Sequence, residues 1–268
     1  MMPELPEVET IRKQLEDEVV NRKIKEVIVK DKRIIKGITP QNFKSNIEGK
    51  SIKEILRRGK VLIIKLNKSL FIVIHLRISG WIILSRNEEK FSRVIFKLSD
   101  GRLLNFCDAR VLGEIKLVND WYSLGIVKEM GPEPLQLKRE EFIKLFKGKK
   151  TKVKPLLMDQ AFLAGIGNVY AQESLFCAGI HPERLASSLT DEELGRIYGC
   201  LISILKEAIK RKGSSVDTYR QIDGKEGEYV PFLKVYQREG QPCVRCKSSI
   251  KRKIIGGRGT YFCPYCQK

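Results

Sequence analysis

The sequence predicts an α+β protein of two domains: an N-terminal β-sandwich with flanking helices, and a C-terminal helical domain that ends in a zinc ribbon. Three observations predict this fold. Short runs of branched apolar residues fill residues 23–118, apolar residues at helical spacing follow beyond residue 134, and two Cys-x2-Cys pairs stand near the C-terminus. A chain of 268 residues is long enough for two domains with separate cores.

The first predicted element is a helix. Its apolar residues recur at helical spacing and charged residues occupy the other face; they are Val8, Ile11, Leu15 and Val19. The segment Pro3–Thr10 leads directly into this helix, so the helix can hold the N-terminus rigidly.

Residues 23–118 are predicted to form β structure. Runs rich in branched residues are Ile24–Val29, Val61–Ile64, Leu70–Leu76, Trp81–Leu84, Val94–Leu98 and Glu114–Val118. Polar turns such as Ser99-Asp100-Gly101 separate them. Several short strands at this spacing predict a two-layer sheet sandwich.

The character of the chain changes around Gly131-Pro132-Glu133-Pro134. Helical patterns follow at Phe142–Phe146 and from Leu194 to Ala208, and Lys147–Lys152 reads as a basic connector. The predicted domain boundary therefore lies near residues 132–150.

The net charge is +19, from 51 Lys and Arg against 32 Asp and Glu. Such an excess favours a polyanionic partner, although a generally lysine-rich proteome is the alternative. Residues 234–268 hold nine basic residues and one acid, Glu239. The longest apolar run, Leu70–Ile74, is too short to cross a bilayer, and no signal-peptide core is present. A cytoplasmic protein without a membrane partner is expected.

Two cysteine pairs match the spacing of a tetrahedral zinc site, with 16 residues between the pairs; the ligands are Cys243, Cys246, Cys263 and Cys266. Sulfur fills all four positions, so one structural Zn²⁺ is predicted. Two short disulfides are the alternative, which a reducing compartment disfavours. Gly256–Thr260 between the pairs predicts a hairpin tip that presents Arg258, a residue suited to a phosphate.

The other three cysteines are scattered along the chain. Cys107, Cys177 and Cys200 are interpreted as small buried hydrophobic residues in a reducing compartment.

Pro3 and Glu4 form a candidate catalytic pair. Proline at a chain terminus carries a secondary amine, which attacks an aldehyde-like carbon and gives a cationic iminium directly. An α-amine has an ordinary pKa of roughly 7.7–8, so much of it is unprotonated near neutrality. Glu4 could supply a proton at the same centre. The alternative is that Pro3–Thr10 only begins a helix.

Together these features resemble the bacterial formamidopyrimidine-DNA glycosylase family, sister to endonuclease VIII. The resemblance runs end to end, through Pro3–Thr10, Arg57–Lys60, Ile74–Gly80, Gly131–Leu135, Lys154–Asp159, Gly165–Ala171, Glu173–Phe176, Ala178–Pro182 and the zinc ribbon. It implies a catalytic β-sandwich domain at residues 1–135, a linker or start of the helical domain at 136–150, a helix–two-turn–helix DNA-binding domain at 151–232, and a zinc finger at 233–268.

The resemblance also implies a chemistry. Pro3 attacks C1′ of a damaged nucleotide that has been flipped from the duplex, and Glu4 protonates the ring oxygen of the sugar. Lys60 assists a first elimination and Arg258 a second, so that a one-nucleotide gap remains. A phosphate contact is an alternative role for Lys60, and the two roles are compatible.

The implied DNA contacts come from both domains. Asn168 and Arg258 would grip phosphate, and Lys149, Lys154 and His75 would lie near the backbone, with a purely structural role as the alternative for His75. Arg110 would face the orphaned cytosine, while Ile78 and Leu112 would fill the vacated stack. Residues 219–232 match the loop that closes over a damaged purine. His181 is interpreted as structural.

The sequence departs from the family pattern at the residues that would fill the vacated stack, called the wedge below, and at one further DNA contact. Ile78 stands where methionine is usual, Val111-Leu112 stands where an Arg-Phe pair is usual, and Phe91 replaces a histidine that touches DNA. The preference for the opposite base and the range of lesions are therefore left open.

The start of the chain departs as well. Met1 precedes Met2, and aminopeptidase removal of methionine requires a small second residue. We expect translation to start at Met2, whose removal exposes Pro3; an intact-mass measurement on protein from the native host tests this.

The predicted function is that of a monomeric base-excision DNA glycosylase for oxidised purines, with abasic-site lyase activity and damaged double-stranded DNA as the partner. In one alternative, the protein uses the same mechanism but removes oxidised pyrimidines, as endonuclease VIII does. Another is a catalytically silent DNA- or RNA-binding protein, if the N-terminus stays blocked.

Overall fold

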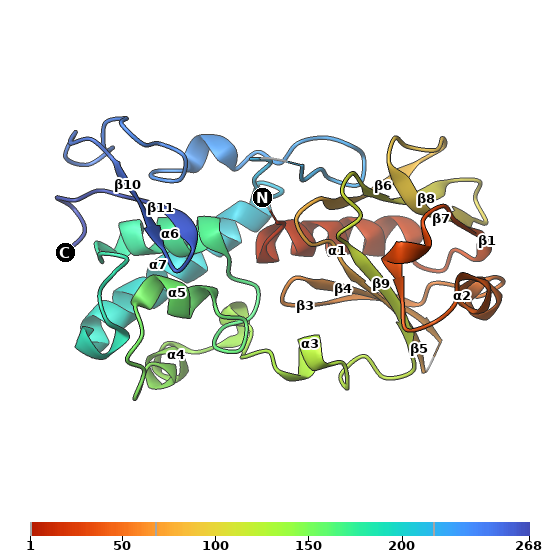
Figure 1. The fold of residues 1–268 in the computed structure, drawn as a ribbon, viewed down its shortest axis with the longest axis horizontal. Coiled ribbons are helices and arrows are strands. Elements are labelled where there is room, and N and C mark those ends of the chain that lie inside the picture. The colour runs from red at the N-terminus through yellow and green to blue at the C-terminus, as the bar shows by residue number, and fades with distance from the viewer. Residues whose placement is uncertain (1, 68, 217) are drawn as a thin grey trace. The chain divides into compact units, whose positions relative to one another are not determined.

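The computed structural model describes residues 2–67, 69–216 and 218–268, and the chain forms two compact units (Figure 1). The first unit is the chain up to Lys128 together with Ile209–Val230; the second is Glu129–Ala208 with Pro231–Lys268. The expected removal of Met1 concerns a residue outside the described ones. The predicted domain limits stay predictions, but the units show that the chain returns to the first unit at Ile209, near the end of α7 (Asp191–Lys210).

The first unit is a β-sandwich, as predicted. One sheet has the strand order β1-β7-β8-β6 and the other β2-β9-β5-β4-β3. Their bounds are β1 Ile24–Val29, β2 Ile35–Lys36, β3 Glu54–Arg58, β4 Val61–Asn67, β5 Leu70–His75, β6 Gly80–Ser85, β7 Ser92–Leu98, β8 Leu103–Asp108 and β9 Glu114–Val118. Neighbouring strands pair antiparallel except β2 and β9, which are parallel. Each predicted run coincides with a strand to within one residue, whereas β2, β3 and β8 were not among the predicted runs.

The prediction of β structure throughout residues 23–118 is wrong at α2 (Pro40–Ile47). Thr39 caps this helix by accepting a hydrogen bond from the Asn42 amide at 3.2 Å, and Pro40 occupies the first turn. Phe43 and Ile47, four residues apart, turn one face into the core. A short helix with only two buried apolar residues gives too weak a helical periodicity in the sequence to be distinguished from the neighbouring strands.

Helix α1 (Leu5–Val19) confirms the predicted N-terminal helix. Its predicted apolar face is buried in the core with side chains of both sheets. At the helix start the Glu4 amide donates to Glu7 Oε2 at 2.9 Å, which satisfies one of the amides that a helix leaves unpaired. The terminal segment is therefore anchored on a buried helix, as predicted.

The second unit is helical and ends in a β-hairpin (Figure 1). Its elements are α4 Arg139–Leu145, α5 Val153–Met158, α6 Asn168–Ala178, α7 Asp191–Lys210 up to Ala208, β10 Lys251–Ile255 and β11 Arg258–Phe262. The other helices among the described residues of both units are short: α3 Gly125–Lys128, and the 3-10 helices η1 Lys32–Ile34, η2 Pro134–Gln136, η3 Ala186–Ser188 and η4 Val230–Phe232. Turns at residues 159–167 join α5 to α6, which gives the helix–two-turn–helix arrangement.

The interpretation of Cys177 and Cys200 as separate buried thiols is wrong, because the structure pairs them in a disulfide with the Cα atoms 5.8 Å apart. Cys177 lies at the end of α6 and Cys200 in the middle of α7. The pairing depends on how these two helices pack, which their separation of 23 residues does not reveal. Cys107 is a buried free thiol, as interpreted.

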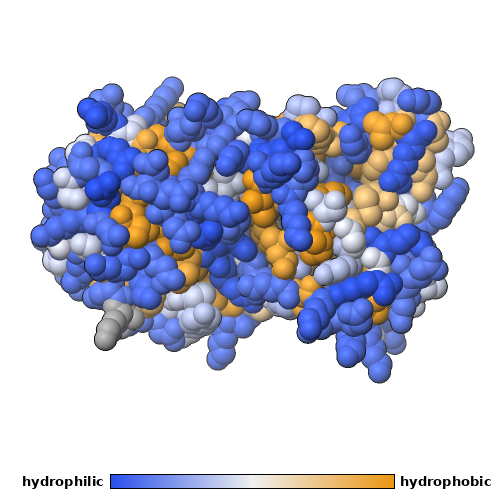
Figure 2. All heavy atoms as spheres, turned by 180° about the vertical axis from the view of Figure 1, so that it is seen from behind, coloured by the Kyte–Doolittle hydropathy of each residue, from blue (hydrophilic) through white to orange (hydrophobic). Residues whose placement is uncertain are grey.

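Hydrophilic residues cover most of the face that Figure 2 shows, and apolar residues form smaller patches among them. This agrees with the charge content of 31%. Among the described residues, no helix has both the length and the hydrophobicity needed to cross a membrane.

Candidate functional site

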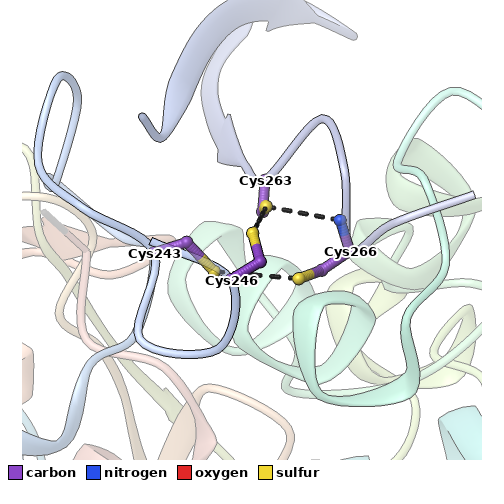
Figure 3. Close-up of side chains that lie close together, drawn as sticks. All are labelled: Cys243, Cys246, Cys263 and Cys266. Carbon is purple, nitrogen blue, oxygen red and sulfur yellow. Dashed lines mark hydrogen bonds between the residues drawn. The ribbon is translucent and has the colours of Figure 1, made fainter. Parts of the chain in front are cut away.

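The four predicted zinc ligands converge in the second unit (Figure 3). Their Sγ atoms all lie within 4.8 Å of one another. The Cys246 and Cys263 sulfurs are 3.5 Å apart, and those of Cys243 and Cys266 are 3.9 Å apart. Sulfurs bound to one tetrahedral zinc at about 2.3 Å lie about 3.8 Å from one another. The thiols therefore fit one zinc ion, and the predicted structural zinc site is confirmed.

Neighbouring groups orient these thiols. The Arg245 amide donates to Cys243 Sγ at 3.4 Å, and the Cys266 amide donates to Cys263 Sγ at 3.3 Å. Ser248 Oγ lies 3.0 Å from Cys246 Sγ and 3.2 Å from Cys263 Sγ. Donors around sulfur stabilise the thiolate form that zinc requires.

The predicted hairpin tip between the cysteine pairs is confirmed. Strands β10 and β11 are joined by Gly256 and Gly257, whose φ angles of 57° and 70° glycine adopts without strain. Arg258 follows as the first residue of β11, and its side chain is exposed. The guanidinium is therefore available to an anionic ligand.

Two amide side chains of α6 bind this hairpin. Asn168 Nδ2 donates to the Gly259 carbonyl at 3.1 Å, and Gln172 Nε2 donates to the same oxygen at 3.2 Å. Gln172 Oε1 accepts from the Tyr261 amide at 2.6 Å. The hairpin that carries Arg258 is thus fixed relative to the start of α6.

Lys154 is fully buried, and its Nζ donates to Asn168 Oδ1 at 2.7 Å. This bond orients the Asn168 amide, because the oxygen faces the ammonium and the nitrogen is left for Gly259. Asn168 is the first residue of α6, and the dipole of a helix favours an anion at its N-terminus. Lys149 lies outside this group on an exposed loop. The DNA contacts of Lys149, Lys154, Asn168 and Arg258 stay predictions.

Pro3 and Glu4 are both buried at the start of α1 in the first unit. Glu7 is wholly buried; its Oε2 holds the Glu4 amide, and its Oε1 accepts from the Ser214 amide at 2.8 Å and from Ser214 Oγ at 3.2 Å. The segment 209–230 is therefore anchored on the first turn of α1. The sequence interpretation missed Glu7 and Ser214; only the adjacency of Glu7 to the Pro3–Glu4 pair could have drawn attention to it.

Lys60 lies at the tight turn between β3 and β4, where Gly59 has a φ of 54°, and it is 5% exposed. Arg57 supports this turn by donating to the Gly59 carbonyl and to Glu9 Oε2, each at 2.9 Å. Glu9 belongs to α1, so the Arg57–Glu9 ion pair ties the Lys60 turn to the helix that follows Pro3. The catalytic role of Lys60 is not tested by this geometry and stays a prediction.

His75, the last residue of β5, is held as a neutral imidazole. Its Nδ1 accepts from the Arg77 amide at 3.0 Å. Burial, together with the charges of Arg77 and Lys60, lowers the pKa of His75 to about 4 against the attraction of Glu114. Because Nδ1 accepts this bond, the neutral ring carries its hydrogen on Nε2, which can donate to a phosphate oxygen. The DNA contact of His75 and its structural alternative both stay predictions.

The His75 side chain is expected to titrate near pH 4 in NMR, well below the ordinary value of 6.5. Because the folded pKa is depressed, the unfolded state binds more protons between pH 6.5 and 4, so folding loses stability as the pH falls through that window. His181 is the only other histidine of the chain, so a His181→Gln variant assigns the signals. A His75 midpoint at or above 6.5 would contradict the buried, neutral state.

The predicted wedge residues are exposed hydrophobic side chains in the first unit. Ile78 is 38% exposed and Leu112 44%. Arg110 is exposed beside Leu112, and Phe91 is 41% exposed. Exposed large apolar side chains gathered on loops are typical of a binding surface. Their contacts with DNA stay predictions.

Three known domain families match successive parts of the chain. They are the formamidopyrimidine-DNA glycosylase N-terminal domain over residues 2–115, the formamidopyrimidine-DNA glycosylase H2TH domain over residues 130–220, and the zinc finger found in FPG and IleRS over residues 240–268. Together they span most of the chain.

Whole proteins give the same result. The formamidopyrimidine-DNA glycosylase of Pelotomaculum thermopropionicum is 42% identical, over all of this chain and 99% of its own length. A Lactococcus lactis FPG variant in complex with Fapy-dG-containing DNA is 35% identical with a TM-score of 0.91, over 99% of this chain and all of that chain. MutM in complex with carbocyclic 8-oxo-G-containing DNA is 35% identical with a TM-score of 0.90, with the same coverage. The chain therefore belongs to the formamidopyrimidine-DNA glycosylase family.

Proposed function

We propose that this protein excises oxidised purines from duplex DNA and then cleaves the strand at the abasic site. The observation that carries the proposal is the Pro3–Glu4 pair, held by Glu7 at the start of α1 in a member of this family. Acting on a base requires that the nucleotide leaves the stack, which costs a few kcal/mol. The protein needs a nucleophile, a proton donor and a means to hold the distorted duplex.

In the proposed mechanism the Pro3 nitrogen, freed as the chain terminus, bonds to C1′ of the flipped nucleotide. The bond from C1′ to the base breaks, the sugar ring opens as Glu4 protonates O4′, and an iminium joins Pro3 to C1′. The cationic iminium acidifies the C2′ hydrogen, so the 3′ phosphate leaves by β-elimination. Lys60 assists this step, and Arg258 assists the δ-elimination that leaves a one-nucleotide gap.

DNA binding is proposed to use both units. In the second, Arg258 and Asn168 grip phosphate, Lys149 and Lys154 add positive charge along the backbone, and the zinc ion maintains the hairpin. In the first, Ile78 and Leu112 fill the vacated stack, and Arg110 faces the orphaned base.

The proposed preference for purines is supported by the solved relatives and by the resemblance of one segment. Solved relatives hold Fapy-dG and carbocyclic 8-oxo-G, both oxidised or ring-opened guanine derivatives, in their DNA. The segment at residues 219–232 also matches the purine-closing loop of the family. We further propose that the protein acts as a monomer in the cytoplasm, on nucleoid DNA.

Excision by protein that starts at Pro3 is expected on duplexes with 8-oxoguanine, fastest opposite cytosine because Arg110 is proposed to face that base. The measurement is single-turnover base release with 8-oxoguanine opposite each of the four bases, together with borohydride capture of the iminium. A duplex with an oxidised pyrimidine is the comparison. Faster release of the oxidised pyrimidine would show that the protein has the substrate preference of endonuclease VIII. DNA binding without base release or adduct capture would show that it is a catalytically silent DNA-binding protein.

A further inference from the structure

Three loops at one edge of the β1-β7-β8-β6 sheet each expose a hydrophobic side chain. Ile78 precedes β6, Phe91 precedes β7 and Leu112 follows β8. The strand register places them at the same edge, because Gly80 pairs with Asp108 and Ser92 pairs with Cys107. These loops, residues 76–80, 86–91 and 109–113, are called the edge loops below.

The carboxylate of Asp108, at the end of β8, binds two of the edge loops. Its Oδ1 accepts from the amides of Arg110 and Val111, each at 3.0 Å, and its Oδ2 accepts from the amides of Leu112 at 2.8 Å and Gly113 at 2.6 Å. Ser79 Oγ, next to Ile78, donates to Oδ1 at 2.5 Å. One wholly buried side chain thus accepts five hydrogen bonds.

The backbone of Asp108 reaches the third edge loop. Its amide donates to the Phe91 carbonyl at 3.0 Å, and its carbonyl accepts from Arg93 Nε at 2.7 Å. Asp108 therefore bonds directly to the backbone of Leu112 and of Phe91, and to Ser79, the neighbour of Ile78.

The loop that carries Leu112 needs this support. Val111 has a φ of 58°, a left-handed conformation that a β-branched residue adopts only with strain. A side chain at Gly113 would force its surroundings to shift, since a Cβ there would lie 2.6 Å from Cζ of the buried Phe106. Consecutive amides that converge on one anion form a nest, and here the anion is the protein's own carboxylate. Charge-assisted hydrogen bonds of this kind are the stronger ones.

We infer that Asp108 is a positioning residue that holds Ile78 and Leu112 projecting before DNA arrives, so that the wedge is formed in advance of base extrusion. The inference rests on the proposed function. A preformed wedge removes the cost of ordering the loops at the moment when the stack opens. Asp108 itself need not touch DNA or the reacting atoms.

The test compares two DNA substrates with the same lesion. In one, 8-oxoguanine is paired with cytosine; in the other it is bulged without an opposite base and so already unstacked. Asp108→Asn keeps the shape but places an NH₂ group against amide donors. It is expected to slow single-turnover release about tenfold to a hundredfold on the paired duplex and less than about threefold on the bulge. An equal loss on both substrates would overturn the inference.

A double-mutant cycle separates positioning from general stability. If Asp108 acts through the wedge, Asp108→Asn in a Leu112→Ala background should cost far less on the paired duplex than it costs alone. The same loss in both backgrounds contradicts the inference.

Ser79→Ala serves if Asp108→Asn does not fold, because it removes only one bond to the carboxylate. It is expected to slow release several-fold on the paired duplex alone. Ser92→Ala is the matched control, since Ser92 is a buried serine at the start of β7 whose hydroxyl contacts Asn105 and Cys107 and not the Asp108 carboxylate. Equal behaviour of the two serine variants would count against Asp108. Wild-type protein that releases no base and gives no adduct on either DNA overturns the proposed function and this inference with it.

Discussion

Replacing Pro3 by glycine is expected to lower the yield of borohydride-captured DNA adduct and the rate of strand cleavage by at least about a hundredfold. A secondary amine condenses directly to a cationic iminium, whereas the primary amine of glycine gives a neutral imine that must gain a proton. Glycine also lacks the ring that restricts the backbone before α1. The measurement is gel quantification of the cross-linked complex with an 8-oxoguanine duplex.

Pro6→Ala is the matched control. Pro6 lies in the first turn of α1, so this variant changes a nearby buried proline and keeps the terminal amine. It should give an adduct within about threefold of the parent protein, since alanine is favourable in a helix.

The state of the N-terminus tests the same chemistry without altering Pro3. Protein whose chain begins at Pro3 should form the adduct, and protein that retains Met2 should not, because the Pro3 nitrogen is then part of an amide bond. Both proteins should bind DNA. Equal adduct yields from the two would exclude Pro3 as the nucleophile.

Removing one zinc ligand has the second large expected effect. Cys263→Ala should reduce bound zinc from one per chain to a small fraction and weaken DNA binding by at least about a hundredfold. Zinc stabilises small zinc fingers by on the order of 10 kcal/mol, more than a short hairpin can replace. Cys243 and Cys263 also pack in an apolar cluster with Phe176 of α6, so the damage extends to the contacts that hold Arg258 and Asn168.

The loss should stay within the second unit. His181 packs edge-on against Phe262 at 4.7 Å between ring centroids, whereas His75 belongs to the first unit. The His181 NMR signal should therefore shift in Cys263→Ala and the His75 signal should not. Cys107→Ala, which alters a buried thiol of the first unit, should keep its zinc. Full DNA affinity in zinc-free protein would contradict the proposed role of the hairpin.

Much of the fold could be predicted because its signals are local. The apolar face of α1 follows from residues three or four positions apart, and the zinc ligands follow from two short motifs joined by a hairpin. The Gly256-Gly257 turn required only the conformational freedom of two adjacent glycines. Helix α2 was missed because two core residues do not make a readable period.

The site depends more on distant contacts. Ser214 bonds Glu7 across 207 residues, and Asn168 bonds the Gly259 carbonyl across 91. The resemblance placed Lys154 near the DNA backbone, but only the fold shows that it is completely buried and that its Nζ orients Asn168. The sequence identified Pro3 and Glu4 as a pair but had no means to indicate what holds them.

By itself, the sequence determined the β-sandwich, the helical region and the zinc ligands, because each is carried by residue types at short, regular spacings. The family followed from the resemblance of many motifs that stand in the same order along the chain. Only the tertiary structure decided that His75 is neutral, that Cys177 meets Cys200, and that Asp108 joins the loops bearing Ile78 and Leu112. The physical reason is that desolvation, disulfide pairing and a shared hydrogen-bond acceptor depend on which groups the folded chain brings within a few ångströms of one another.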